Sequence, residues 1–219
     1  LGDNISIGPF CLVGENAKIG NGTKLTSHVL VDGHTDIGND NTIHEFSSIG
    51  VAPQDKSYNG EPTKTIIGDG NLIREGCTVH RATTKQDKVT VIGDNGYFMT
   101  GVHFAHDCVI GNNVTLANST MCAGHVHVGS FVQMGGSCGV APFCHVGEGA
   151  FIGAASAIDK LKNAYNPTYK HIIESAKIIL RATLTENNMS VLKLRSFKKL
   201  AIKTGTGYFL ISIHAIFAS

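Results

Sequence analysis

The stretch Ile7-Gly-Pro-Phe-Cys-Leu-Val13-Gly-Glu-Asn-Ala-Lys-Ile19-Gly20 has an aliphatic residue at every sixth position, each followed by glycine. The spacing continues in both directions from this stretch. Nine aliphatic residues fall in phase in this first run: Leu1, Ile7, Val13, Ile19, Leu25, Val31, Ile37, Ile43 and Ile49. An apolar period of six matches neither the helical period of 3.6 nor the strand period of 2.

A second in-phase run follows a short continuation at Ile67, Ile73 and Val79. All its positions are apolar: Ile92, Phe98, Phe104, Ile110, Leu116, Cys122, Val128, Met134, Val140, Val146, Ile152 and Ile158. Three hexads, each a short strand and a tight corner, make one coil, and coils stack at the strand spacing of about 4.8 Å. The pattern predicts an all-β solenoid over residues 1–160, a left-handed parallel β-helix of hexapeptide repeats about 40 Å long.

The repeat ends after Lys160, where spaced apolar residues alternate with lysines. We expect a small, abbreviated C-terminal α-helical region over residues 161–219, with helical segments at 172–184 and 189–202. Such a region would cover the open end of the solenoid.

The composition excludes several classes of protein. Lysine and arginine number 18 against 17 acidic residues, which gives no electrostatic case for binding nucleic acid or an anionic membrane surface. No apolar run reaches the roughly 18 residues that span a bilayer. Five of the six cysteines stand four residues after an aliphatic position, which predicts buried small side chains rather than disulfides or metal ligands. We expect a cytoplasmic protein, or an organellar one in a eukaryote; the chain begins at Leu1, so a preceding targeting segment is left open.

Two polar insertions interrupt the repeat, at residues 51–64 and 82–90. Loops that leave a regular solenoid often carry function. We interpret the first as functional, whereas the second fits a functional loop and a tolerated surface insertion equally well.

Histidines gather in the middle of the predicted rod. His125 follows His106 by 19 residues, close to one 18-residue coil, so both should lie on one edge of the rod, with His103 across a corner. An imidazole can take a proton from a hydroxyl and return it to a leaving group, and Asp107 could orient His106 if a corner lets the two neighbours reach one site. The alternative is a zinc site in which His103, His106 and His125 supply three ligands.

The motifs in these regions resemble those of the UDP-N-acetylglucosamine O-acyltransferases, which catalyse the first step of lipid A synthesis. The resemblance is close over residues 1–158 and looser to about residue 200. It is carried by Gln54-Asp55, Gly60-Glu-Pro-Thr63, Ile73-Arg-Glu75, Val79-His-Arg81, His103-Phe-Ala-His-Asp-Cys108, Leu116-Ala-Asn118 and Ala123-Gly-His-Val126.

The resemblance implies a homotrimer that moves a (3R)-3-hydroxyacyl group from acyl carrier protein to the 3-hydroxyl of UDP-N-acetylglucosamine, without metal or other cofactor. It makes His106 the general base, Asp107 the residue that orients it and Gly124 the backbone N–H that stabilises the oxyanion. Further positions match substrate-binding residues of the family: Gln54, Asp55, His80 near the uridine or phosphate end, His103, His125, Ala154 as a limit on acyl length, and Arg195 for a phosphate or the carrier protein.

Three departures from the family pattern bear on what is bound. Ala141 and Pro142 replace a histidine and a glutamine that bind substrate, and Leu194 replaces one arginine of a pair. Three other readings therefore stay open: the N-acyltransferase of the same pathway, a γ-class carbonic anhydrase-like zinc enzyme, and a degenerate, non-catalytic β-helix scaffold. The N-acyltransferase usually has an N-terminal uridine-binding domain, for which this chain offers no sign.

Overall fold

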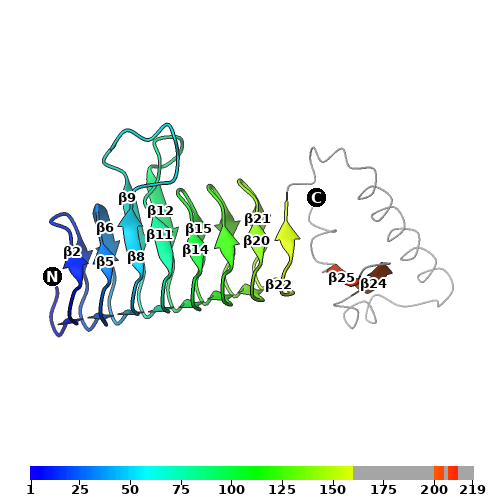
Figure 1. Cartoon of the computed structure of the whole chain (residues 1–219), viewed down its shortest axis with the longest axis horizontal. Helices are drawn as coiled ribbons and strands as arrows, with labels where there is room; N and C mark the ends of the chain where they lie inside the picture. The colour runs from blue at the N-terminus through cyan, green and yellow to red at the C-terminus, as the bar shows by residue number, and fades with distance from the viewer. Residues whose placement is uncertain (160–199, 205–206, 212–219) are drawn as a thin grey trace. The chain divides into compact units, whose positions relative to one another are not determined.

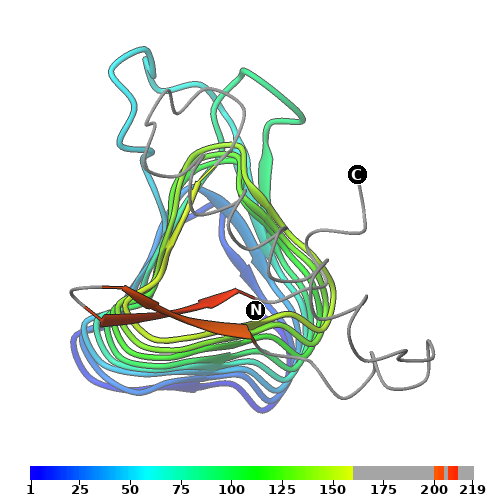
Figure 2. The ribbon, with the colours of Figure 1, turned by 90° about the vertical axis from the view of Figure 1, so that its right-hand side faces the viewer.

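The computed structural model describes residues 1–159, 200–204 and 207–211. The chain divides into two compact units, Leu1–Asp159 and Lys160–Ser219. The first unit consists of three parallel sheets that wind around a common interior, and its coils form a triangle when viewed along the rod (Figure 1, Figure 2). This confirms the predicted left-handed parallel β-helix.

Successive strands along the chain pass from one sheet to the next, so each strand pairs with the strand three elements later. The first sheet contains β1 (Ser6–Ile7), β4 (Lys24–Leu25), β7 (Thr42–Ile43), β10 (Leu72–Ile73), β13 (Tyr97–Phe98), β16 (Thr115–Leu116), β19 (Gln133–Met134) and β22 (Phe151–Ile152). The second contains β2 (Leu12–Val13), β5 (Leu30–Val31), β8 (Ser48–Val51), β11 (Thr78–His80), β14 (His103–Phe104), β17 (Met121–Cys122), β20 (Gly139–Val140) and β23 (Ala157–Ile158). The third contains β3 (Lys18–Ile19), β6 (His34–Ile37), β9 (Lys64–Ile67), β12 (Val89–Ile92), β15 (Val109–Ile110), β18 (His127–Val128) and β21 (His145–Val146).

The core is a ladder of the in-phase apolar side chains. In β14, for example, Phe104 points inward and is fully buried, whereas His103 points out of the sheet, because neighbours in a strand face opposite sides. Phe98 and Phe104 meet edge to face at 5.0 Å between ring centroids. Burying a side chain of this size stabilises the fold by about 1.5–3 kcal/mol, so the ladder holds the coils in register. Five cysteines are buried and unpaired, as predicted, whereas Cys11 is partly exposed.

Several corners place non-glycine residues in the left-handed backbone conformation, which the high glycine count does not predict. Asp107, His125 and Phe143 have φ of +60°, +62° and +61° at equivalent corners of three successive coils. This conformation costs a non-glycine residue roughly 1–2 kcal/mol. The cost is offset by the ladder, and the turn points these side chains away from the direction that a regular strand would give them.

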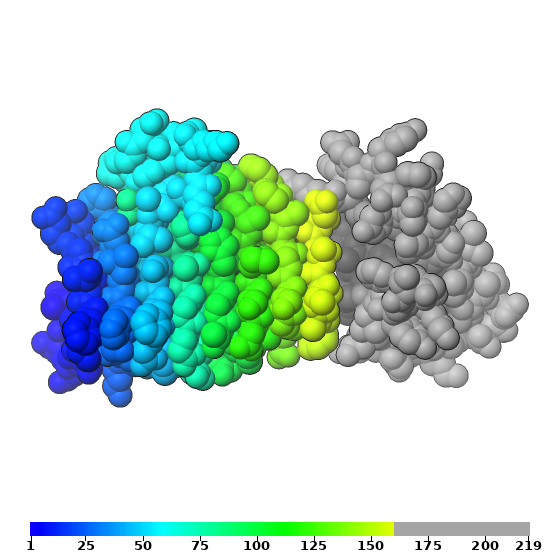
Figure 3. All heavy atoms as spheres, in the orientation of Figure 1, coloured from blue at the N-terminus to red at the C-terminus, as the bar shows by residue number. Residues whose placement is uncertain are grey.

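The two insertions leave the rod at consecutive coils. The first loop, residues 52–63, connects β8 to β9, and the second loop, residues 81–88, connects β11 to β12. Strands β9 and β12 are hydrogen-bonded neighbours, so the loops emerge side by side at one edge of the rod (Figure 1, Figure 2). The space-filling view shows the first loop standing out from an otherwise even surface (Figure 3).

The second unit differs from its prediction where it is described. β24 (Leu200–Thr204) and β25 (Gly207–Ile211) form an antiparallel pair, so residues 200–202 are extended and not the end of a helix. Isoleucine, threonine, tyrosine and phenylalanine together supply five of the ten residues of these two strands and favour extended structure, which outweighs the helix-like spacing. The predicted helical segment 172–184 and the rest of 189–202 lie outside the described residues. Among the residues that are described, no helix is long and apolar enough to cross a bilayer.

Candidate active site

A groove of about 570 Å³ runs along the outer face of the second sheet. Its lining follows the outward positions of successive strands, from His103 in β14 through Met121 and Gly139 to Ala157 in β23. One end is polar and the other apolar. The polar end is lined by Gln54, His80, His103 and His106. The apolar end is lined by Met121, Val140, Ala141, Ala157 and Ile158, with Asp159 next to Ile158.

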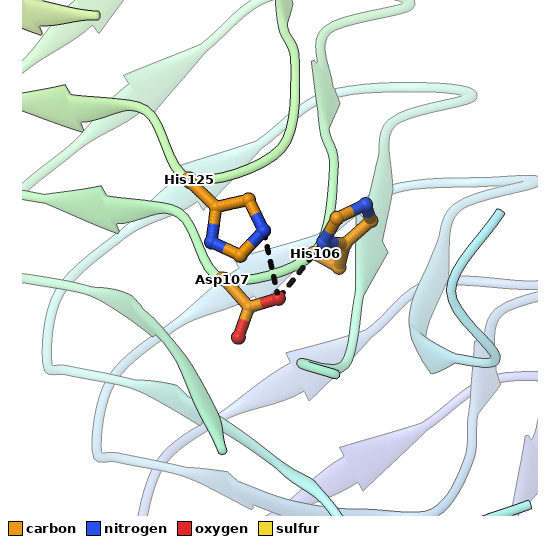
Figure 4. A group of neighbouring side chains, drawn as sticks. All are labelled: His106, Asp107 and His125. Atoms are coloured by element: carbon orange, nitrogen blue, oxygen red, sulfur yellow. Dashed lines mark hydrogen bonds and ion pairs between the residues drawn. The ribbon is translucent and has the colours of Figure 1, made fainter. Parts of the chain in front are cut away.

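His106 and Asp107 form a hydrogen-bonded pair at the polar end. His106 Nδ1 donates to Asp107 Oδ2 at 2.8 Å, which leaves Nε2 as the outer ring nitrogen (Figure 4). The side chain of His106 is 14% exposed and that of Asp107 only 2%. The adjacent residues His106 and Asp107 reach each other because Asp107 has a left-handed backbone conformation at the corner.

Asp107 is held in place by the second loop and by the interior of the rod. Its Oδ2 accepts hydrogen bonds from the N–H of Thr83 at 3.0 Å and from the hydroxyl of Thr83 at 2.7 Å. Its own N–H donates to Thr90 Oγ1 at 2.8 Å. Burial raises the pKa of Asp107, but the hydrogen bonds from His106 and Thr83 outweigh burial and hold that pKa below its usual value. Asp107 is therefore an anion that can orient His106 and stabilise its protonated form.

His125 lies one coil further along the same corner, as predicted, but it does not line the groove. Its ring meets that of His106 edge to face at 5.1 Å and stacks on Phe143. Its Nε2 lies 3.8 Å from Asp107 Oδ2, and its Nδ1 is hydrogen-bonded to Gln86 Oε1 at 2.5 Å. His125 is buried, so in this structure it supports His106 from behind.

Asp55 reaches the same site from the first loop. Its Oδ2 lies 3.9 Å from His106 Nε2 and 2.5 Å from the ammonium of Lys85. Its Oδ1 accepts hydrogen bonds from the N–H and the hydroxyl of Ser57. The bond from Lys85, followed by those from Ser57, holds the pKa of Asp55 well below its usual range.

His80 and His103 lie next to each other on the wall of the groove, 5.2 Å apart between ring centroids. His80 Nδ1 donates to the carbonyl of Ala52 at 2.7 Å, and His103 Nδ1 bonds to the hydroxyl of Thr78 at 2.7 Å. Burial, followed by the neighbouring His80 and His106, lowers the pKa of His103 to about 4. Burial also lowers the pKa of His80, so both rings are neutral at pH 7 and offer a polar, uncharged wall.

Gly124 packs against the face of His106. A Cβ added at Gly124 would lie 2.5 Å from His106 Cε1 and 2.8 Å from Nε2, so no larger residue fits without moving the ring. The N–H of Gly124 has no acceptor among the described residues. The backbone therefore approaches the imidazole closely and has a donor to offer to a reacting group.

The fold does not bring the ligand atoms of His103, His106 and His125 together into the three-histidine zinc site considered from the sequence. At this corner the ligand atoms that come together belong to His106, Asp107 and His125, whereas His103 bonds to Thr78. The 2.8 Å bond joins His106 Nδ1 directly to Asp107 Oδ2, as in an oriented general base.

The remaining predicted residues are placed as follows. Gln54 lines the groove, Ala154 is exposed and not among the lining residues, and Arg195 lies outside the described residues. Ala141, one of the departures, lines the apolar end. Sequence reasoning missed Thr83, Lys85, Gln86 and Phe143. The first three lie in the second insertion, whose break in the hexapeptide repeat is the signal that could have found them.

No family model matches the chain. The acyl-[acyl-carrier-protein]–UDP-N-acetylglucosamine O-acyltransferase of Thermodesulfovibrio yellowstonii is 52% identical over 127 residues, which cover 58% of this chain and 49% of that protein. The solved UDP-N-acetylglucosamine O-acyltransferase of Moraxella catarrhalis is 46% identical with a TM-score of 0.71, covering 72% of this chain and 62% of that one. LpxA of Acinetobacter baumannii is 44% identical with a TM-score of 0.71, covering 73% and 63%. The chain spans about half the length of the curated relative. Over its β-helix, this chain is therefore similar in both sequence and fold to the UDP-N-acetylglucosamine O-acyltransferases.

Proposed function

We propose that this chain transfers a (3R)-3-hydroxyacyl group from acyl carrier protein to the 3-hydroxyl of UDP-N-acetylglucosamine, with His106 as the general base. The observation that carries the proposal is the His106–Asp107 pair, whose imidazole lines a groove that is polar at one end and apolar at the other. The names of the relatives supply the two substrates.

The geometry supports a direct transfer. His106 Nε2 accepts the proton of the sugar hydroxyl while the hydroxyl oxygen attacks the thioester carbonyl carbon. Asp107 stabilises the imidazolium that forms. The N–H of Gly124 donates to the oxyanion of the tetrahedral intermediate. When the intermediate collapses, the carbon–sulfur bond breaks and the carrier thiolate takes the proton back from His106. The products are the ester and the free carrier thiol.

The two ends of the groove suit the two substrates. Asp55, Gln54, His80 and His103 surround His106 with acceptors and neutral imidazoles, which are groups that bind sugar hydroxyls and the nucleotide end. The apolar end, from Met121 to Ile158, offers a surface that an acyl chain can cover. In this assignment Ala141 takes part in the apolar wall.

The test is an assay of the purified protein with UDP-N-acetylglucosamine and a panel of (3R)-3-hydroxyacyl carrier proteins of different chain length. We expect turnover with at least one chain length and a fall of about 10²–10⁴-fold in kcat for His106→Ala. His145→Ala, an exposed histidine in β21 of a different sheet, is the matched control and should keep wild-type activity. No product across the panel would favour the non-catalytic scaffold, and near-normal turnover of His106→Ala would remove it as the base.

We also propose a homotrimer in which the groove of one copy is completed by its neighbour. The groove is open along its length in a single chain, and Ala154, the residue expected to limit acyl length, does not line it. Size-exclusion chromatography with light scattering tests this directly, with a mass near three times 23.2 kDa expected. A monomer that is fully active would contradict it.

A further inference from the structure

The second loop contacts three different polar neighbours of His106. Thr83 donates two hydrogen bonds to Asp107, Lys85 pairs with Asp55, and Gln86 bonds to His125. Within the described residues, no hydrogen bond joins this loop to His106 itself. The loop therefore acts on His106 through the residues that surround it.

Lys85 makes the connection between the two loops. Its ammonium lies 2.5 Å from Asp55 Oδ2, and the same oxygen lies 3.9 Å from His106 Nε2. Ser57 holds the other carboxylate oxygen, so Asp55 is fixed by its own loop on one side and by the second loop on the other. Because both distances share this oxygen, the ammonium lies within about 6.4 Å of His106 Nε2, close enough for its charge to affect the ring.

The charged and titratable groups around His106 come from five elements. They are Asp107 on its own corner, His125 on the corner one coil on, His103 in β14, His80 in β11 and Asp55 on the first loop. Among the described residues, Lys85 is the one lysine or arginine that hydrogen-bonds a member of this set. Two carboxylates next to an imidazole favour its protonated form, and a protonated ring cannot act as a base.

We propose that Lys85 is a positioning residue of the acyl-transfer site, whose ammonium holds the Asp55 carboxylate beside His106 and offsets the negative charge of that carboxylate. The inference rests on the proposed function, because it assigns Lys85 a role through the base of that reaction. Lys85 does not touch the reacting atoms in this assignment. Its side chain is 49% exposed, so removing its charge leaves the core of the rod intact.

The test compares Lys85→Met and Lys85→Arg with the wild type, and uses Lys88→Met as the matched control. Lys88 is an exposed lysine of the same loop, and its backbone carbonyl accepts a hydrogen bond from the N–H of Lys64, which the substitution keeps. Two quantities are measured: the pH dependence of kcat/KM, and the NMR titration of the His106 ring in the absence of substrates, assigned with His106→Ala.

In Lys85→Met we expect the acid limb of kcat/KM and the titration midpoint of His106 to move to higher pH by about one unit. Lys85→Arg should stay close to wild type and Lys88→Met should match it. The inference would be overturned if the acid limb of kcat/KM and the titration midpoint of the His106 ring in Lys85→Met matched those of the wild type. An equal shift in Lys88→Met would also overturn it. If the wild type transfers no acyl group, the proposed function fails, and the ring titration alone then decides the role of Lys85.

Discussion

The ring of His125 lies flat on the ring of Phe143, with centroids 4.3 Å apart and an interplanar angle of 3°. The two residues occupy the same corner of successive coils, and the N–H of Phe143 donates to the carbonyl of Gly124. The stack closes a column in which Phe143 supports His125 and His125 meets the edge of His106. Because Phe143 is 45% exposed, its side chain contributes little to the stability of the fold, and its larger contribution is to the position of His125 in the site.

Replacing Phe143 with leucine should lower kcat/KM by about threefold to tenfold, because a stacked pair of rings contributes about 0.5–1.5 kcal/mol and its loss lets His125 move. The stability should change little. Steady-state kinetics and thermal unfolding measured together check this. Phe131→Leu, at an exposed corner that does not line the groove, is the control. An unchanged kcat/KM in Phe143→Leu would show that the stack is not needed.

Asp107→Asn should reduce kcat by about 10²–10⁴-fold while the rod stays folded, because a neutral amide cannot stabilise the imidazolium. The hydrogen bonds from Thr83 can still be accepted by the amide oxygen. Circular dichroism shows whether the fold is kept, and single-turnover kinetics show whether the chemical step is slowed. A raised KM with wild-type kcat would instead make Asp107 a binding residue.

Gly124→Ala should lower activity by about 100-fold or more, because the added Cβ meets the His106 ring at 2.5 Å and displaces it from the groove. Gly147→Ala is the matched control, since a Cβ there meets nothing within 4 Å and its φ is not in the left-handed region. The two variants are compared by kcat/KM and by melting temperature. Equal activity of the two would argue against close approach at Gly124.

The protein should lose stability as the pH falls from about 6.5 to about 4, partly through His103. The folded-state pKa of His103 is about 4, below its unfolded value, so the unfolded state binds the proton first and stability rises with pH across this window. His103→Gln removes that contribution. We expect the difference in melting temperature between pH 7 and pH 5 to be smaller in His103→Gln than in wild type. Equal differences would mean that His103 titrates normally in the folded protein.

The sequence by itself determined the solenoid and the meeting of His106 with its corner neighbours. In a rod of regular coils, a sequence separation near 18 places two residues one coil apart, so the separation of 19 between His106 and His125 translates directly into contact. The corner conformation that brings Asp107 to His106 follows from the same period, because the hexad sets where each strand ends.

Only the tertiary structure decided how the two loops complete the site and what His125 does there. The loops lack the period, so their side chains are placed by long-range bonds such as Lys85 to Asp55, 30 residues apart, and Gln86 to His125, 39 apart. The burial of His125 depends on the ring of Phe143 and on Gln86, neither of which its own sequence neighbourhood contains. The strand pair β24–β25 was likewise decided by pairing between segments, because short apolar segments fit a helix and a strand equally until they find a partner.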